Sequence, residues 1–110
     1  QNLMANVQAM GELFHDRLNG LKEKHALVGD VRGKGLMWGL ELVKDRASKE
    51  HATAEAVAVM EAARERGLLI GKGGLHGNVI RFSPPYTISR EECERVVEVL
   101  DQCLTAVAGT

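Results

Sequence analysis

The sequence predicts an α+β fold in which a small, mostly antiparallel sheet is covered by helices, mainly on one face. Apolar residues recur at steps of three or four in three stretches, which indicates helices. Four other stretches are short and apolar or alternate between apolar and polar residues, which indicates strands. The order is helix, strand, strand, helix, strand, strand, helix. With 110 residues, the chain has the length of one domain.

The first predicted element is a long amphipathic helix over residues 2–24. Its apolar stripe consists of Leu3, Val7, Met10, Phe14, Leu18 and Leu21. Gly11 and Gly20 weaken the helix without breaking it. A helix of this length spans about 35 Å, which is long for so small a domain. We therefore expect it to run on into another part of a longer protein, and Gln1 in place of an initiator Met favours the same interpretation.

Two strands come next, at residues 27–32 and 36–43, and a hairpin with a glycine-rich turn is the simplest way to join them. In the second strand, alternation places the large apolar residues Leu36, Trp38, Leu40 and Leu42 on one face.

The last helix has the clearest start signal. Ser89 is predicted as its N-cap, and Glu92 completes a capping box three residues later. The segments between the hairpin and this helix are predicted as a loop at 44–50, a helix at 53–66, a strand at 68–70, a glycine-rich loop at 71–77 and a strand at 78–82.

Charge and hydropathy exclude two classes of function. The chain has 14 basic and 15 acidic residues, so a basic face for nucleic acid is not expected. It has no apolar run long enough to span a membrane. Cys93 and Cys103 lie ten residues apart in one predicted helix, about 15 Å along its axis. They are too far apart for a disulfide, which favours a reducing compartment such as the cytoplasm.

The histidines and glycines give no strong functional signal. His15, His25, His51 and His76 are scattered, so no metal site is predicted. The glycine patterns lack the spacing and the strand–helix context of a dinucleotide fingerprint, and turns or close backbone contacts explain them. The loop at 71–77, with Lys72 and His76, is a weaker candidate for a substrate-facing segment.

Arg81 departs from its local pattern. It lies inside the apolar strand 78–82, where alternation places it on one face with Val79 and places Ile80 and Phe82 on the other. A buried guanidinium needs a partner, so Arg81 either reaches solvent at a sheet edge or meets a carboxylate of the protein or of a ligand.

Three charged residues of the first strand also share one face. Asp30, Arg32 and Lys34 alternate along residues 29–35. They form either a solvated face or an ion-pair network between subunits or domains.

Four separated segments resemble, in order and spacing, those of class III (subgroup II, ω-type) aminotransferases, especially the alanine–glyoxylate and 4-aminobutyrate types. The segments are VGDVRGKGLMWGLELV at 28–43, ARERGLLI at 63–70, NVIRFSPP at 78–85 and ISREE at 88–92. The resemblance implies the fold type I architecture of pyridoxal-phosphate enzymes. Residues 1–24 then match the helix that connects the two domains, and residues 25–110 match the C-terminal small domain.

The resemblance also implies a role for Arg81, since the arginine of this motif binds the substrate carboxylate in the family. The substrates implied are an amino acid and a 2-oxo acid, and the partners are the large domain of the same chain and a second subunit of a homodimer. The cofactor, pyridoxal 5'-phosphate, would be anchored by the large domain. No lysine of the chain stands in the motif of the Schiff-base lysine: Lys22, Lys24, Lys34, Lys44, Lys49 and Lys72 all have polar surroundings in the sequence. We therefore expect the segment alone to be inactive.

Two other interpretations remain open. The chain could be a free-standing α+β module that binds an amino acid for regulation or assembly. It could also be a structural dimerisation element, for which Arg81 would have no function.

Overall fold

The computed structural model describes residues 2–74 and 76–108, which contain three helices and five strands. In chain order they are α1 (Leu3–Lys24), β1 (Val28–Lys34), β2 (Met37–Asp45), β3 (Glu50–His51), α2 (Thr53–Glu65), β4 (Gly71–Gly73), β5 (Val79–Phe82) and α3 (Arg90–Ala108). Gln1, Leu75 and residues 109–110 lie outside the described residues. They fall within the predicted connecting helix at 1–24, the predicted loop at 71–77 and the predicted small domain at 25–110.

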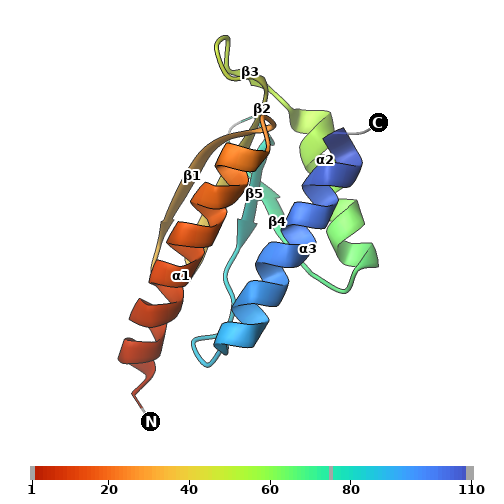
Figure 1. Ribbon diagram of the computed structural model, residues 1–110. Coiled ribbons are helices and arrows are strands. Elements are labelled where there is room, and N and C mark those ends of the chain that lie inside the picture. Colours follow the sequence, from red (N-terminus) through yellow and green to blue (C-terminus); the bar gives the residue numbers. More distant parts are fainter. Residues whose placement is uncertain (1, 75, 109–110) are drawn as a thin grey trace.

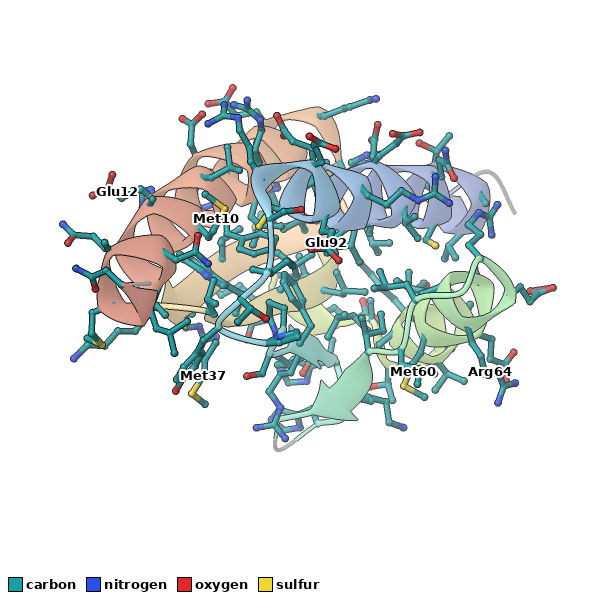
Figure 2. The ribbon with its side chains drawn as sticks, turned by 90° about the horizontal axis from the view of Figure 1, so that it is seen from below. Met10, Glu12, Met37, Met60, Arg64 and Glu92 are labelled. Carbon is teal, nitrogen blue, oxygen red and sulfur yellow. The ribbon has the colours of Figure 1, made fainter. Side chains whose placement is uncertain are left out.

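The strands form one sheet in the order β1-β2-β5-β4, with β3 paired to β2, and every pairing is antiparallel. Figure 1 shows α1 and α3 side by side across one face of this sheet, with α2 beside α3 and β4. The α+β prediction is therefore confirmed. The predicted alternation in the second strand also holds, since Leu36, Trp38, Leu40 and Leu42 are all buried. Met37 lies on the other side of the sheet, away from α1 and α3 (Figure 2).

The first helix begins at an asparagine cap and packs into the core along most of its length. The Asn2 side chain accepts a hydrogen bond from the Ala5 amide at 3.1 Å, which satisfies one of the free donors of the first turn. Met10 turns inward whereas Glu12 points away from the molecule (Figure 2). Phe14 meets Phe82 of β5 edge to face, with the ring centroids 5.4 Å apart. The helix and the sheet thus share one core.

The last helix starts as the sequence predicts. The Glu92 amide donates to Ser89 Oγ at 3.1 Å, and the Ser89 amide donates to Glu92 Oε1 at 2.9 Å, which is a complete capping box. Cys93 and Cys103 are free and buried. In the part of the chain that the structure describes, no helix is both long and apolar enough to span a lipid bilayer.

Two predictions about strands are wrong. Residues 68–70 are not a strand; β4 is formed instead by Gly71–Gly73, the start of the predicted loop at 71–77. The reason is pairing, because Gly71 and Gly73 lie opposite Arg81 and Val79 of β5. The polar segment 44–50 is also not wholly a loop. At its two ends, β2 continues to Asp45 and Glu50 opens β3, which folds back on β2.

Candidate substrate-binding site

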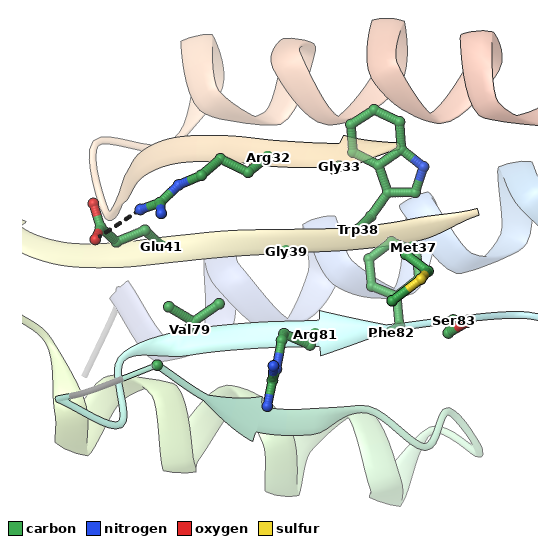
Figure 3. A pocket seen from close by; sticks show the side chains of 11 residues that line it. Arg32, Gly33, Met37, Trp38, Gly39, Glu41, Val79, Arg81, Phe82 and Ser83 are labelled. Carbon is green, nitrogen blue, oxygen red and sulfur yellow. Dashed lines mark hydrogen bonds and ion pairs between the residues drawn. The ribbon is translucent and has the colours of Figure 1, made fainter. Parts of the chain in front are cut away.

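The face of the sheet that the helices leave open carries a pocket of about 590 Å³. Its wall is built from β1, β2 and β5, with Gly74 after β4 completing one side. Figure 3 shows the two arginines of this wall, Arg32 and Arg81, on either side of Gly39. Register explains the arrangement, since Gly39 lies opposite Arg32 on one side and opposite Arg81 on the other.

Arg81 reaches solvent from the interior of the sheet. Its strand, β5, lies between β2 and β4 and is therefore not at the sheet edge. One of the two alternatives from the sequence expected Arg81 to reach solvent at an edge, and that position is wrong. Ile80 and Phe82 point into the core, and this leaves Arg81 on the open face, as alternation predicts. Among residues 2–74 and 76–108, no carboxylate forms an ion pair with its guanidinium.

The other arginine of the pocket is already paired. Arg32 Nε donates to Asp30 Oδ2 at 2.9 Å, and Arg32 Nη2 donates to Glu41 Oε2 at 3.1 Å (Figure 3 draws the second pair). The charged face predicted for the first strand thus forms an ion-pair network within this chain, while Lys34 is exposed at the end of β1. Arg81 is therefore the guanidinium of this pocket that remains available to an anionic ligand.

The predicted substrate-facing segment at 71–77 contributes less than expected. Lys72 lies opposite Ile80, so it points to the face of the sheet that Arg81 does not share. The His76 ring stacks on the His51 ring, with centroids 3.7 Å apart, and the His76 carbonyl accepts a hydrogen bond from Thr53 Oγ1. Gly74 lines the pocket, whereas Lys72 and His76 do not.

None of the six lysines lines the pocket or is buried. Lys24 pairs with Asp101 at 2.9 Å, and Lys44 pairs with Glu50 at 3.8 Å. A lysine that forms an imine needs a desolvated or cationic environment. Five of the six lysines are exposed, and Lys22 is half-buried. Within residues 2–74 and 76–108, no three His, Cys, Asp or Glu side chains gather into a metal site either.

Alternation along the strand gives the face of Arg81, but it does not reveal the glycines around this residue. Gly39 and Gly71 lie directly opposite Arg81 on its two neighbouring strands, and Gly73 lies two residues further along β4. The spacing Gly-x-Gly was visible in the sequence. Its meaning depends on the register between β4 and β5, which the sequence does not specify. As a result, Arg81 has no side chain directly opposite it on either neighbouring strand.

The chain is similar to known proteins over nearly its whole length. The family model described as aminotransferase class-III matches residues 1–104. The chain is 44% identical to the mitochondrial alanine–glyoxylate aminotransferase 2 homolog 2 of Arabidopsis thaliana, over 96% of the chain and 22% of the relative. It is 41% identical to the leucine/methionine racemase of Thermococcus litoralis, over 97% of the chain and 24% of the relative.

Solved structures give the same result. A Bacillus anthracis aminotransferase superposes with a TM-score of 0.89 at 36% identity, covering 96% of the chain and 24% of that structure. An amine transaminase from an uncultivated Pseudomonas species, in its pyridoxal-phosphate-bound form, superposes with a TM-score of 0.84 at 33% identity and covers 96% of the chain and 24% of that structure. The chain thus spans about a quarter of the length of the proteins it resembles. Its sequence over residues 1–104 and its fold place it in the class III aminotransferase family, whose members depend on pyridoxal phosphate.

Proposed function

We propose that this chain is the carboxylate-binding part of an aminotransferase that moves an amino group from an amino donor to a 2-oxo acid. The observation that carries the proposal is the exposed Arg81 guanidinium, which has no carboxylate partner among residues 2–74 and 76–108 and lines a pocket on the open sheet face. Amino acids and 2-oxo acids share a carboxylate, and an arginine fork binds that group with two parallel hydrogen bonds. Arg81 therefore orients either substrate in the same way.

The rest of the machinery belongs, in this proposal, to a larger protein. Residues 1–24 connect a large domain to the small domain at 25–110, and the small domain closes over the bound substrate by a hinge motion. Pyridoxal phosphate, held by the large domain of a homodimer, supplies the electron sink for the reaction. The contribution of this chain is to bind and orient the carboxylate.

A racemase is a second candidate, because the identity to the leucine/methionine racemase, 41%, is close to the 44% identity to the aminotransferase homolog. The substrate of an amino-acid racemase also carries a carboxylate, so the role of Arg81 is the same in both reactions. Assays of the full-length protein separate them. Transfer of the amino group to a 2-oxo acid supports the aminotransferase, whereas inversion of one enantiomer without an acceptor supports the racemase.

Substitution of Arg81 in the full-length protein tests the binding role. Hydrogen bonds to a charged group contribute about 1.5–3 kcal/mol each, so Arg81→Ala is expected to lower kcat/KM for an amino-acid substrate by about 10- to 100-fold or more. Arg81→Lys keeps the charge but loses the fork, and an intermediate loss is expected. A primary amine without a carboxylate serves as the control substrate, and its half-reaction should be unaffected. An unchanged kcat/KM for the amino acid in Arg81→Ala would contradict the proposal and favour a structural dimerisation element.

The isolated 110-residue chain provides a second test. After incubation with pyridoxal phosphate and desalting, it should keep no visible absorption band and show no transamination, because it offers no lysine in a suitable environment. A stable band would contradict this expectation. Tight calorimetric binding of a free amino acid to the same chain would favour the alternative of a stand-alone amino-acid-binding module.

A further inference from the structure

The side chain of Arg81 is directed over β4, and the strand beneath it has no side chain on that face. Figure 3 shows Arg81 extending across β4, away from the Arg32–Glu41 pair. Residues 71 and 73 share the face of Arg81 because they alternate with Lys72, and both are glycines.

Gly73 lies in contact distance of the guanidinium itself. A Cβ placed on Gly73 would lie 2.3 Å from Arg81 Nε, 2.4 Å from Cζ and 2.4 Å from Nη2. Cζ would be as close as the two nitrogens, so the planar group presents its face to Gly73. The N–H donors of a guanidinium lie in its plane. Resting on its face therefore leaves these donors free for a ligand.

From this contact we propose that Gly73 is a positioning residue for Arg81. The guanidinium packs against the backbone of Gly73, and this contact sets the orientation in which its N–H donors meet a carboxylate. Any side chain at this position would lift the guanidinium off the strand and turn its plane. This inference rests on the proposed role of Arg81, and it adds that the carboxylate-binding geometry depends on a residue without any side chain to contact the substrate.

The same strand supplies a matched control. A Cβ on Gly71 would have the carbonyl oxygen of Arg81 as its nearest neighbour, at 3.8 Å, which is an ordinary contact. Neither Gly71 nor Gly73 has a positive φ, so alanine suits the backbone at both positions. Gly71→Ala and Gly73→Ala thus make the same chemical change in one strand, and only the second meets the guanidinium.

The test uses the full-length protein and an unreactive carboxylate that carries the chain of the substrate without its amino group. Calorimetry is expected to give a dissociation constant at least tenfold higher for Gly73→Ala than for the wild type, and an unchanged one for Gly71→Ala. The half-reaction with a carboxylate-free primary amine should be the same in all three proteins, because a displaced guanidinium affects only carboxylate binding. An unchanged dissociation constant in Gly73→Ala would overturn the inference, as would an equal loss with the carboxylate-free amine.

Arg81→Ala and the double variant Gly73→Ala/Arg81→Ala complete the cycle. On the Arg81→Ala background, Gly73→Ala should have no further effect on carboxylate binding, since no guanidinium remains to be displaced. If Gly73→Ala alone fails to fold, folding of the double variant supports the contact, and its failure to fold overturns it. If Arg81→Ala itself binds the carboxylate normally, the proposed function fails. If Arg81→Ala loses carboxylate binding and Gly73→Ala binds the carboxylate normally, the positioning role of Gly73 fails and the role of Arg81 stands.

Discussion

At the scale of single residues, the two glycines of α1 should respond to alanine in opposite ways. A Cβ at Gly11 would lie 2.7 Å from the carbonyl oxygen of Gly35, a backbone atom of the β1–β2 turn, whereas a Cβ at Gly20 would meet nothing within 4 Å. Gly11→Ala must push the helix away from the hairpin, and overpacking of this kind costs about 1–3 kcal/mol. Gly20→Ala should instead stabilise the chain by up to about 1 kcal/mol, because alanine is the better helix former.

Denaturant unfolding of the two variants measures this difference. Gly20→Ala is the control for the helix-propensity gain that both substitutions share, so the difference between the variants isolates the contact with Gly35. Equal midpoints for the two variants would show that α1 and the hairpin do not approach each other this closely.

Arg81 and Gly73 show what a sequence conveys about single residues. Arg81 could be found because a charge inside an apolar strand breaks a local rule, and alternation then gives its face correctly. Gly73 could not be found in this way, because glycine in a turn and glycine under a guanidinium look alike in a sequence. Only the register of β4 against β5 distinguishes them.

At the scale of elements, helices were predicted better than strands. The helical stripes and the capping box of α3 are local, so the sequence contains them. A strand also requires a partner. The segment 68–70 has the composition of a strand, yet Leu69 is 81% exposed, and the neighbouring glycines pair with β5 in its place. Tertiary pairing here overrides β-propensity, which is low for glycine.

The end of α1 is tied to α3 by a buried histidine. His25 is only 8% exposed, and its Nε2 lies 2.6 Å from Asp101 Oδ1, while Lys24 contacts the other oxygen at 2.9 Å. Asp101→Ala would leave the imidazole of His25 buried without this partner. We expect a loss of about 1–3 kcal/mol in the free energy of unfolding, measured by denaturant titration. Asp16→Ala is the control, because Asp16 is 77% exposed in its pair with Arg17 and should change stability little.

The same tie predicts a dependence on pH. The hydrogen bonds from His25 and Lys24 hold the pKa of Asp101 below its usual value. A carboxylate whose pKa is lowered by folding stabilises the native state above the unfolded pKa, about 3.9, and this contribution is lost as the pH falls through the folded pKa. The difference in stability between the wild type and Asp101→Ala should therefore shrink below about pH 4. If the difference in stability between the two proteins stayed constant from pH 7 to pH 3, Asp101 would not be ionised in its contacts with His25 and Lys24.

At the scale of the whole molecule, α1, the sheet and α3 enclose a single core. Buried residues of α1 belong to the same cluster as those of β2, β5 and α3, and Phe14 and Phe82 join the first helix to the sheet. Both cysteines lie in this cluster on α3. Their reactivity therefore reports whether the core as a whole is closed.

Burial raises the pKa of Cys93 to about 11, with the carboxylates of Glu92 and Glu94 adding to the effect, and burial also raises the pKa of Cys103. The thiolate is the reactive form, so at pH 8 only about one Cys93 in a thousand is ionised in the folded chain, against roughly a quarter of an unfolded thiol with a pKa near 8.5.

Iodoacetamide at pH 8 should thus modify both cysteines slowly under native conditions and quickly in denaturant, as followed peptide by peptide with mass spectrometry. Because the unfolded thiols ionise first, stability should also fall as the pH rises from about 8.5 towards 11. If Cys103 were labelled rapidly and Cys93 slowly under native conditions, the C-terminal part of α3 would open on its own. The core would then not open as a single unit.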